Sequence, residues 1–236
     1  MHVRRLAVLV CAVSGFGQPL WHKTTTFHSR RGRATIEEYA SRAPTTDAAA
    51  VILLCGSGGV QSSAVPYADE ARLFAHTGYR VYLPHYLDVT RGHASDPEMH
   101  YGIWAQTVLD ALQYIQSEAD IPPSRTAIVG YSLGGSVALS VAAMESHLAG
   151  VVVWSGSLPD AYRDVEMLPP LLILHGTRDS VIPVDNARQL AALCTIKHLG
   201  CDLSIYYEEG HAFSAAGLTR ANREIQAFLD TVLRPP

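Results

Sequence analysis

The sequence has no run of 18 consecutive apolar residues among its 236 residues, so it predicts no membrane-spanning helix of the usual kind. It has no basic run beyond residues 30–33, and its formal net charge of −4 gives no electrostatic footprint for nucleic acid. Internal repeats and low-complexity tracts are also missing. These absences exclude a solenoid, a chain built from membrane helices and a basic nucleic-acid-binding protein.

Composition predicts one folded domain with a sizeable core. Hydrophobic residues make up 48% of the chain and charged residues 17%, which suits a core covered on both sides and argues against disorder. A chain of this length buries roughly 70% of the surface that its unfolded form exposes.

Short apolar runs alternate with helical patterns along the chain. We expect strands over residues 24–28, 33–40, 49–55, 79–83, 126–130, 150–154, 171–175 and 202–207, and helices over residues 67–77, 99–119, 184–194 and 218–233, with a further helix after Ser132. The first two strands form an antiparallel pair that turns at residues 31–32, and residues 85–100 form a polar loop. The alternation predicts the α/β class, with a mostly parallel twisted sheet and helices on both faces. The connection after Trp154 is too short for a large cap domain, so we expect an open site.

The run at residues 127–135 is the most informative part of the sequence. It reads Ala-Ile-Val-Gly-Tyr-Ser-Leu-Gly-Gly, an apolar strand that leads into a glycine-flanked serine and then into a helix. A serine at the tip of such a sharp turn has a strained backbone, and a Cβ at Gly130 or Gly134 would collide with the crossing chain. The pentapeptide also arises by chance in a chain with 18 glycines. The strand before it and the helix after it favour Ser132 as a nucleophile.

A serine alone is a poor nucleophile, and two later turns offer the groups that would activate it. Asp179 follows the apolar strand at residues 171–175, and His211 follows the alternating strand at residues 202–207. The order serine, acid, histidine is the one expected on this architecture. His211 would take the Ser132 proton, and Asp179 would fix the imidazole tautomer and stabilise the imidazolium. As alternatives, Asp179 caps the next helix, and His211 is an ordinary surface or core histidine.

A glycine-rich turn after the strand at residues 49–55 predicts hydrogen-bond donors for a developing oxyanion. Residues 56–59 read Gly-Ser-Gly-Gly, which lets the backbone approach a substrate carbonyl closely. We expect the Ser57 N–H to donate, with Gly58 second. The Leu133 N–H, at the start of the helix after the nucleophile, is the other expected donor. An ordinary glycine-rich turn is the alternative.

From about Thr25 to its C-terminus the chain resembles the α/β-hydrolases, and among them the dienelactone-hydrolase-like group. The resemblance rests on Leu-Cys-Gly-Ser-Gly-Gly at residues 54–59, Gly-Tyr-Ser-Leu-Gly-Gly at 130–135, His-Gly-Thr-Arg-Asp-Ser-Val-Ile-Pro at 175–183 and Glu-Gly-His-Ala-Phe at 209–213. It implies the α/β-hydrolase fold without a large cap domain. Family members often carry histidine where this chain has Cys55, and the enzymes that name the group use a cysteine nucleophile where this chain has Ser132.

The serine argues against dienelactone as the substrate and for a serine hydrolase that cleaves carboxylic esters of small soluble substrates through an acyl-enzyme on Ser132. A thioesterase or a small peptidase of the same fold would use the same triad and oxyanion hole, so both stay open. A non-catalytic binding module is the alternative from a different class. We expect no cofactor and a small-molecule ester as partner. The sequence gives neither the acyl and alcohol groups nor the oligomeric state.

Aromatic residues near the expected strand ends are candidates for lining the substrate pocket. Tyr131 and Phe213, with Gly58, are the expected substrate contacts; Tyr82, His85, Tyr86 and Trp154 are further candidates for lining it. Core packing or a place at the rim is the alternative for each of them. The histidines and aspartates within residues 85–100 show no tight i,i+4 spacing, so no metal site is predicted.

The N-terminus has the layout of an export signal. A short basic region around Arg4 and Arg5 precedes eight apolar residues and a run of small residues. We expect residues 1–22 to be a signal peptide and lead-in, and residues 23–236 to be a single hydrolase domain that is exported to the periplasm or secreted. An extra edge strand in a cytoplasmic protein is the alternative.

Two of the four cysteines are placed so that they could form a disulfide. Cys194 ends an expected helix, and Cys201 opens the next strand seven positions later, so a short loop would bring their Cα atoms within reach of a bond. Such a bond suits an exported protein. Two unrelated buried thiols are the alternative, and Cys55 is expected to stay a buried free thiol.

Overall fold

The computed structural model describes residues 20–41, 49–61, 66–91 and 96–234. Most of the expected signal segment, residues 1–19, therefore lies outside the described residues. The first strand begins at Trp21, two residues inside the expected lead-in of residues 1–22.

The described strands form one sheet of eight in the order β1-β2-β4-β3-β5-β6-β7-β8. They are β1 (Trp21–Ser29), β2 (Gly32–Ala40), β3 (Ala50–Leu54), β4 (Arg80–Pro84), β5 (Thr126–Tyr131), β6 (Gly150–Trp154), β7 (Leu171–Gly176) and β8 (Cys201–Tyr206). β1 and β2 pair antiparallel, as do β2 and β4, and every other pairing is parallel. The predicted fold class, a mostly parallel sheet, is confirmed.

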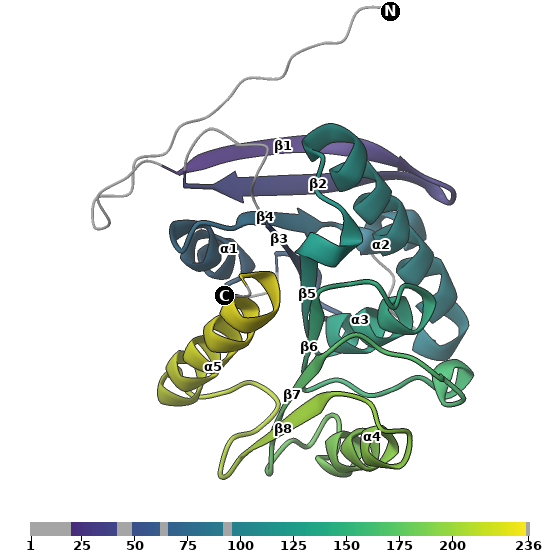
Figure 1. The fold of residues 1–236 in the computed structure, drawn as a ribbon, viewed down its shortest axis with the longest axis vertical. Coiled ribbons are helices and arrows are strands. Elements are labelled where there is room, and N and C mark those ends of the chain that lie inside the picture. Colours follow the sequence, from purple (N-terminus) through teal and green to yellow (C-terminus); the bar gives the residue numbers. More distant parts are fainter. Residues whose placement is uncertain (1–19, 42–48, 62–65, 92–95, 235–236) are drawn as a thin grey trace, which may run out of the picture.

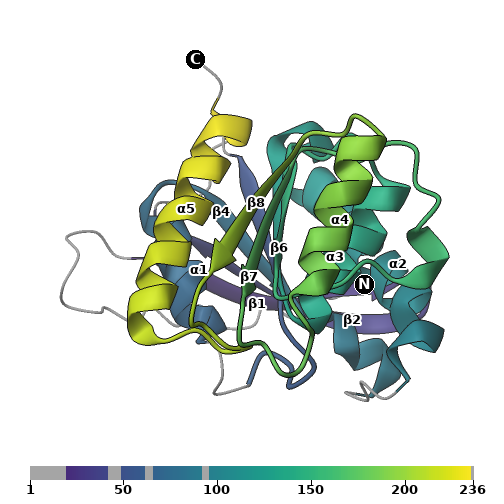
Figure 2. The same ribbon diagram turned by 90° about the horizontal axis from the view of Figure 1, so that it is seen from below.

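Helices cover both faces of the sheet (Figures 1 and 2). The helices are α1 (Tyr67–His76), α2 (Pro97–Ala119), α3 (Leu133–Met144), α4 (Asp185–Ile196) and α5 (Ala215–Leu233), with 3₁₀ turns η1 (Tyr86–Thr90), η2 (Pro123–Arg125) and η3 (Asp160–Tyr162). Figure 1 places α1 and α5 on one face and α2, α3 and α4 on the other. No described helix is both long enough and apolar enough to span a bilayer.

The central strands are apolar throughout because helices cover both of their sides. Every residue of β3, β5, β6 and β7 is buried, so these strands read as continuous hydrophobic runs. β8 lies at the edge, and of its six residues only Tyr206 is buried. The buried α3 packs between the sheet and α2, which explains why its sequence is almost entirely small and apolar.

The structure moves a few predicted boundaries. The β1–β2 turn lies at residues 30–31, one residue earlier than predicted, and α2 begins at Pro97, inside the expected loop, because proline is favoured at the first helical position. That loop also contains η1. Between β6 and β7 the only regular structure is η3, as expected for a chain without a large cap domain.

The predicted disulfide is confirmed. Cys194, at the end of α4, is bonded to Cys201, at the start of β8, with their Cα atoms 6.1 Å apart. A loop this short contributes about 2.5 kcal/mol in the chain-entropy model. Cys55 is a buried free thiol, also as predicted, and burial raises its pKa to about 12.

Candidate active site

Ser132 lies on the sharp turn that joins β5 to α3. Its φ of 55° and ψ of −122° fall in a region that a non-glycine residue seldom occupies, so the predicted strain is present. A Cβ at Gly130 would overlap the Gly134 carbonyl, and one at Gly134 would overlap the Leu54 carbonyl at the end of β3. Glycine is therefore required at both positions by the close approach of three backbone segments.

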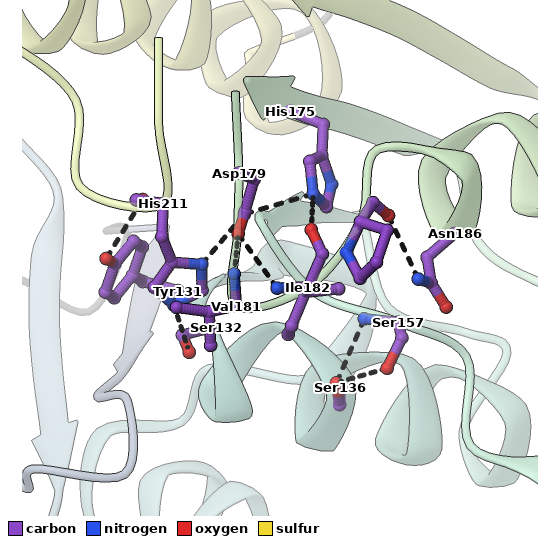
Figure 3. Close-up of polar contacts among 11 residues, drawn as sticks. Tyr131, Ser132, Ser136, Ser157, His175, Asp179, Val181, Ile182, Asn186 and His211 are labelled. Carbon is purple, nitrogen blue, oxygen red and sulfur yellow. Dashed lines mark hydrogen bonds and ion pairs between the residues drawn. The ribbon is translucent and has the colours of Figure 1, made fainter. Parts of the chain in front are cut away.

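The Ser132 side chain is directed to a histidine and does not cap the helix that follows. Serine at a helix N-cap ordinarily accepts a hydrogen bond from the first turn, but Ser132 makes no such bond. Its Oγ lies 2.8 Å from His211 Nε2 instead (Figure 3). The hydroxyl is thus placed to give its proton to the imidazole.

Asp179 holds the other side of that imidazole. His211 Nδ1 lies 2.8 Å from Asp179 Oδ2, and the Asp179 side chain is fully buried. The second oxygen, Oδ1, accepts the backbone N–H groups of Val181 at 2.9 Å and Ile182 at 2.8 Å. The three residues predicted as a triad are therefore joined in one hydrogen-bonded chain that begins at Ser132 and ends at a carboxylate fixed by the backbone.

The β7–α4 and β8–α5 loops, which carry Asp179 and His211, are hydrogen-bonded to each other. The Thr177 N–H donates to the Tyr206 carbonyl at 3.0 Å, and the Arg178 N–H donates to the Glu209 carbonyl at 2.8 Å. A Cβ at Gly176 would overlap the Glu209 carbonyl, so a glycine is needed at the end of β7. This contact sets the spacing between the acid and the base.

An aromatic cluster packs against the loop that carries His211. The Tyr131 hydroxyl donates to the His211 carbonyl at 3.1 Å, and burial raises the Tyr131 pKa to about 12, so the hydroxyl keeps its proton. Trp154 makes edge contacts with Tyr131 and Phe213, whose ring centroids lie 5.3 Å and 5.0 Å from its own. The structure thus places Tyr131, Trp154 and Phe213 together at the site, where they support the histidine loop. Substrate contact by Tyr131 and Phe213 stays a prediction.

The glycine-rich segment after β3 forms a tight turn beside the serine. The Gly59 N–H donates to the Gly56 carbonyl at 3.0 Å, so Ser57 and Gly58 are the exposed central residues of the turn. Gly56 comes closest to the nucleophile, since a Cβ there would lie 3.3 Å from the Ser132 Cβ. Leu133 is the first residue of α3, where N–H groups have no intrahelical acceptor. The donor roles of Ser57 and Leu133 stay predictions.

Two tyrosines support this turn. The Gly56 N–H donates to the Tyr67 hydroxyl at 2.7 Å, and the Tyr86 hydroxyl donates to the Cys55 carbonyl at 2.6 Å. Tyr86 was predicted to line the pocket, and this is wrong, because its side chain has no exposed surface.

The structure also moves Tyr82 away from the predicted pocket, whereas a place for His85 in that pocket stays a prediction. Tyr82 is 2% exposed, and its hydroxyl donates to Glu38 at 3.2 Å, so it joins β4 to β2 and cannot line an open site. His85 Nε2 lies 2.9 Å from Glu37 Oε1, also on β2. Both side chains are used to pair the antiparallel part of the sheet.

Sequence reasoning missed the contribution of Gly56, Tyr67 and His175. Gly56 and His175 lie within the quoted motifs, and a histidine that ends an apolar strand is a visible signal of a buried polar contact. Tyr67 carries no such signal, because its contact with Gly56 depends on how α1 packs. Among the described residues no group of three or more His, Cys, Asp or Glu side chains could hold a metal ion.

The arrangement matches a strained serine nucleophile with its base and orienting acid, beside the N-terminus of a helix. Comparison with known proteins points the same way. Residues 36–228, well over half of the chain, match the family model described as "Dienelactone hydrolase family".

The individual relatives are distant. A Yersinia pestis protein named "Putative carboxymethylenebutenolidase" is 30% identical over 101 residues, which are 39% of this chain and 38% of that protein. Acyl-protein thioesterase 1 of Debaryomyces hansenii is 31% identical over 123 residues, 49% of this chain and 51% of that protein. The chain thus spans about half or less of the length of these curated relatives. A dienelactone hydrolase structure from Anabaena variabilis has a TM-score of 0.74 at 17% identity, covering 90% of this chain and 98% of its own, and it shares the fold.

Proposed function

Because the chain belongs to the dienelactone hydrolase family, we propose that it is a serine hydrolase that cleaves carboxylic esters of small soluble substrates. The observation that carries this proposal is the hydrogen-bonded chain from Ser132 through His211 to Asp179, with both links at 2.8 Å. Ser132 forms the first link in place of capping α3, which is the geometry of a nucleophile and its base.

The proposed reaction has two halves. In the first, His211 Nε2 accepts the Ser132 proton as Oγ attacks the acyl carbon, and the ester C–O bond then breaks as His211 returns that proton to the leaving alcohol. In the second, water gives a proton to His211 and attacks the acyl carbon; the bond to Ser132 Oγ then breaks, His211 returns that proton to Oγ, and the carboxylic acid leaves. Asp179 stays ionised and stabilises the imidazolium in both halves.

We assign the oxyanion of each tetrahedral intermediate to the start of α3. The Leu133 N–H and the positive end of the helix dipole favour negative charge there. The turn at residues 56–59 would supply the second donor, with the Ser57 N–H as the assigned group. The Gly56 N–H is already used by the Tyr67 hydroxyl, which supports a donor further along the turn.

A thioesterase is the second candidate function, favoured by the 31% identity to acyl-protein thioesterase 1. Both reactions use the same nucleophile and intermediate, so they differ only in the leaving group. Peptide hydrolysis needs protonation of a poorer leaving group and is the third member of this series.

One purified sample tests the proposal. Wild-type protein should react with a fluorophosphonate probe and hydrolyse short p-nitrophenyl esters, and Ser132→Ala should do neither. Rates on acyl-CoA thioesters and peptide amides, measured in parallel, assign the leaving-group class. A folded wild-type protein that neither labels nor turns over any of these substrates would reject the hydrolase and favour a binding module.

We also propose that the segment before Trp21 carries the export signal, and that the mature protein contains the domain that begins with β1. The Cys194–Cys201 disulfide supports this, because such bonds persist in oxidising compartments. N-terminal sequencing of the mature protein tests it: an intact Met1 would reject export.

A further inference from the structure

His175 is a buried polar side chain that the proposed mechanism does not use. It lies on β7, whose residues Leu171 to Leu174 are all apolar, and none of its surface is exposed. A histidine buried this completely needs hydrogen-bond partners, because an unpaired polar group in the interior is costly. The groups within hydrogen-bond distance of His175 therefore indicate what this side chain does.

Both partners of the His175 Nε2 are acceptors. It lies 2.8 Å from the Ile182 carbonyl and 3.2 Å from Asp179 Oδ2 (Figure 3). A carbonyl and a carboxylate oxygen can only accept, so Nε2 must carry the hydrogen, which it donates to the Ile182 carbonyl with Asp179 Oδ2 beside that bond. The other nitrogen, Nδ1, is buried without a partner among the described residues, which fits a bare nitrogen. His175 is therefore the neutral Nε2–H tautomer.

This donor shares an oxygen with the triad. Asp179 Oδ1 accepts the N–H groups of Val181 and Ile182, whereas Oδ2 accepts His211 Nδ1 at 2.8 Å and also lies 3.2 Å from His175 Nε2. The backbone contacts fix one end of the carboxylate, and the two histidines fix its rotation. The positive end of the His175 N–H dipole, 3.2 Å from Oδ2, draws negative charge of that oxygen away from its bond to His211.

We propose that His175 is a positioning residue for the acid of the triad, which holds Asp179 Oδ2 toward His211 and weakens that carboxylate as a hydrogen-bond acceptor. His211 is then paired with a weaker acceptor than an unshared carboxylate would be, and the pH dependence of kcat/KM should respond when the His175 donor is removed. This inference deepens the proposed function and rests on it.

His175 itself stays neutral over the range in which His211 changes charge. A second proton would have to sit on the buried Nδ1, and burial lowers the pKa of His175. The titratable groups that face it are Asp179 and His211. A cationic His211 disfavours a second proton on His175 still further.

Two substitutions distinguish a role of His175 as a hydrogen-bond donor from a role in which its ring only fills space. His175→Phe keeps the ring but removes the hydrogen, whereas the amide nitrogen of His175→Gln can reach the place of Nε2 and donate. For His175→Phe we expect the midpoint of the acid limb of kcat/KM against pH to rise by about half to one unit, with kcat lowered about three- to tenfold. His175→Gln should restore both quantities toward wild type. A merely structural role would change the Tm but leave the pH midpoint of folded protein unchanged.

A measurement without substitution guards against variants that do not fold. ¹⁵N NMR of wild-type protein should show His175 as the neutral Nε2–H tautomer from pH 8 down through the acid limb. An Nδ1–H tautomer, or a folded His175→Phe variant with the wild-type pH midpoint, would overturn the inference. Either result would leave the proposed function intact, since that fails only if wild-type protein shows no activity dependent on Ser132.

Discussion

Asp179→Asn tests the geometry of the site most sharply, because the surrounding donors dictate how the new amide must lie. The two backbone N–H groups on Oδ1 require an acceptor, so the asparagine oxygen takes that place. Its NH₂ group then occupies the place of Oδ2 and faces His211 Nδ1 and His175 Nε2. The N–H group of each histidine would then face the NH₂ group of the amide, and two donors cannot form a hydrogen bond.

The result is a histidine in the wrong tautomer. His211 accepts from the amide only through a bare Nδ1, which moves its hydrogen to Nε2, where Ser132 Oγ needs an acceptor. We therefore expect kcat to fall by about 10³- to 10⁴-fold, as expected when the base is present in the wrong tautomer. Turning the amide over would leave two buried N–H groups unpaired at a cost of about 1–3 kcal/mol each, so the protein cannot avoid the problem that way.

The same reasoning gives a loss of stability. Losing the charged acceptor for His175 should lower the free energy of unfolding by about 1.5–3 kcal/mol in urea titrations. The matched control is Asp185→Asn, since Asp185 is exposed on α4 and pairs with Arg188 at 2.7 Å. That variant should keep its activity and its stability. Turnover of p-nitrophenyl acetate by Asp179→Asn within tenfold of wild type would refute this account of the acid.

Three further outcomes follow from the structure. Ser132→Ala should lower kcat by about 10⁴- to 10⁶-fold without changing the Tm, measured on an activated ester. Gly134→Ala should lower the free energy of unfolding by about 1–3 kcal/mol or more, whereas Gly200→Ala, with open space around it, should change it by less than about 0.5 kcal/mol; equal effects would contradict the close-approach argument. The hydrogen bond from His85 lowers the Glu37 pKa to about 2, so the stability it contributes is present above the unfolded pKa of about 4.3 and lost as pH falls toward 2. Glu37→Gln should therefore flatten the fall in urea stability between about pH 5 and pH 2, and an unchanged slope would contradict this.

The elements predicted most reliably from the sequence are those in which the immediate surroundings of each residue allow few residue types. The strand at residues 150–154 was predicted with the bounds that the structure gives, because a run of buried valines has one stable environment. Gly130 and Gly134 were predictable for the same reason, since no other residue fits the turn on either side of Ser132. The boundaries that moved, at the β1–β2 turn and the start of α2, lie where several residues serve equally well.

The residues that support the site were harder to predict because any element can supply them. Tyr67 comes from α1, Tyr131 from β5 and His175 from β7, and each meets the site through a single hydrogen bond or a shared one. A backbone N–H, a backbone carbonyl or a carboxylate requires only a suitable polar partner at the right distance, not a particular residue at a particular spacing. Tyr82 and Tyr86 show the opposite problem, because a tyrosine near a strand end also serves purposes other than lining a pocket. Tyr82 joins β4 to β2, and Tyr86 supports the turn after β3.

We therefore expect sequence variation among related sites to concentrate in the residues that support the triad. In the proposed mechanism Ser132 gives its proton to His211 while Asp179 stays ionised and orients the imidazole, so each of the three fixes the identity of its neighbour, and the glycines fix the backbone that carries the nucleophile. A donor such as His175 only modulates the acid, and Gln or Ser reaching the same oxygen from another element would do similar work. If His175 acts as proposed, the pH dependence of the reaction depends on a residue that exchanges no proton with the substrate, and it has to be derived from the contacts of Asp179 as well as from the triad itself.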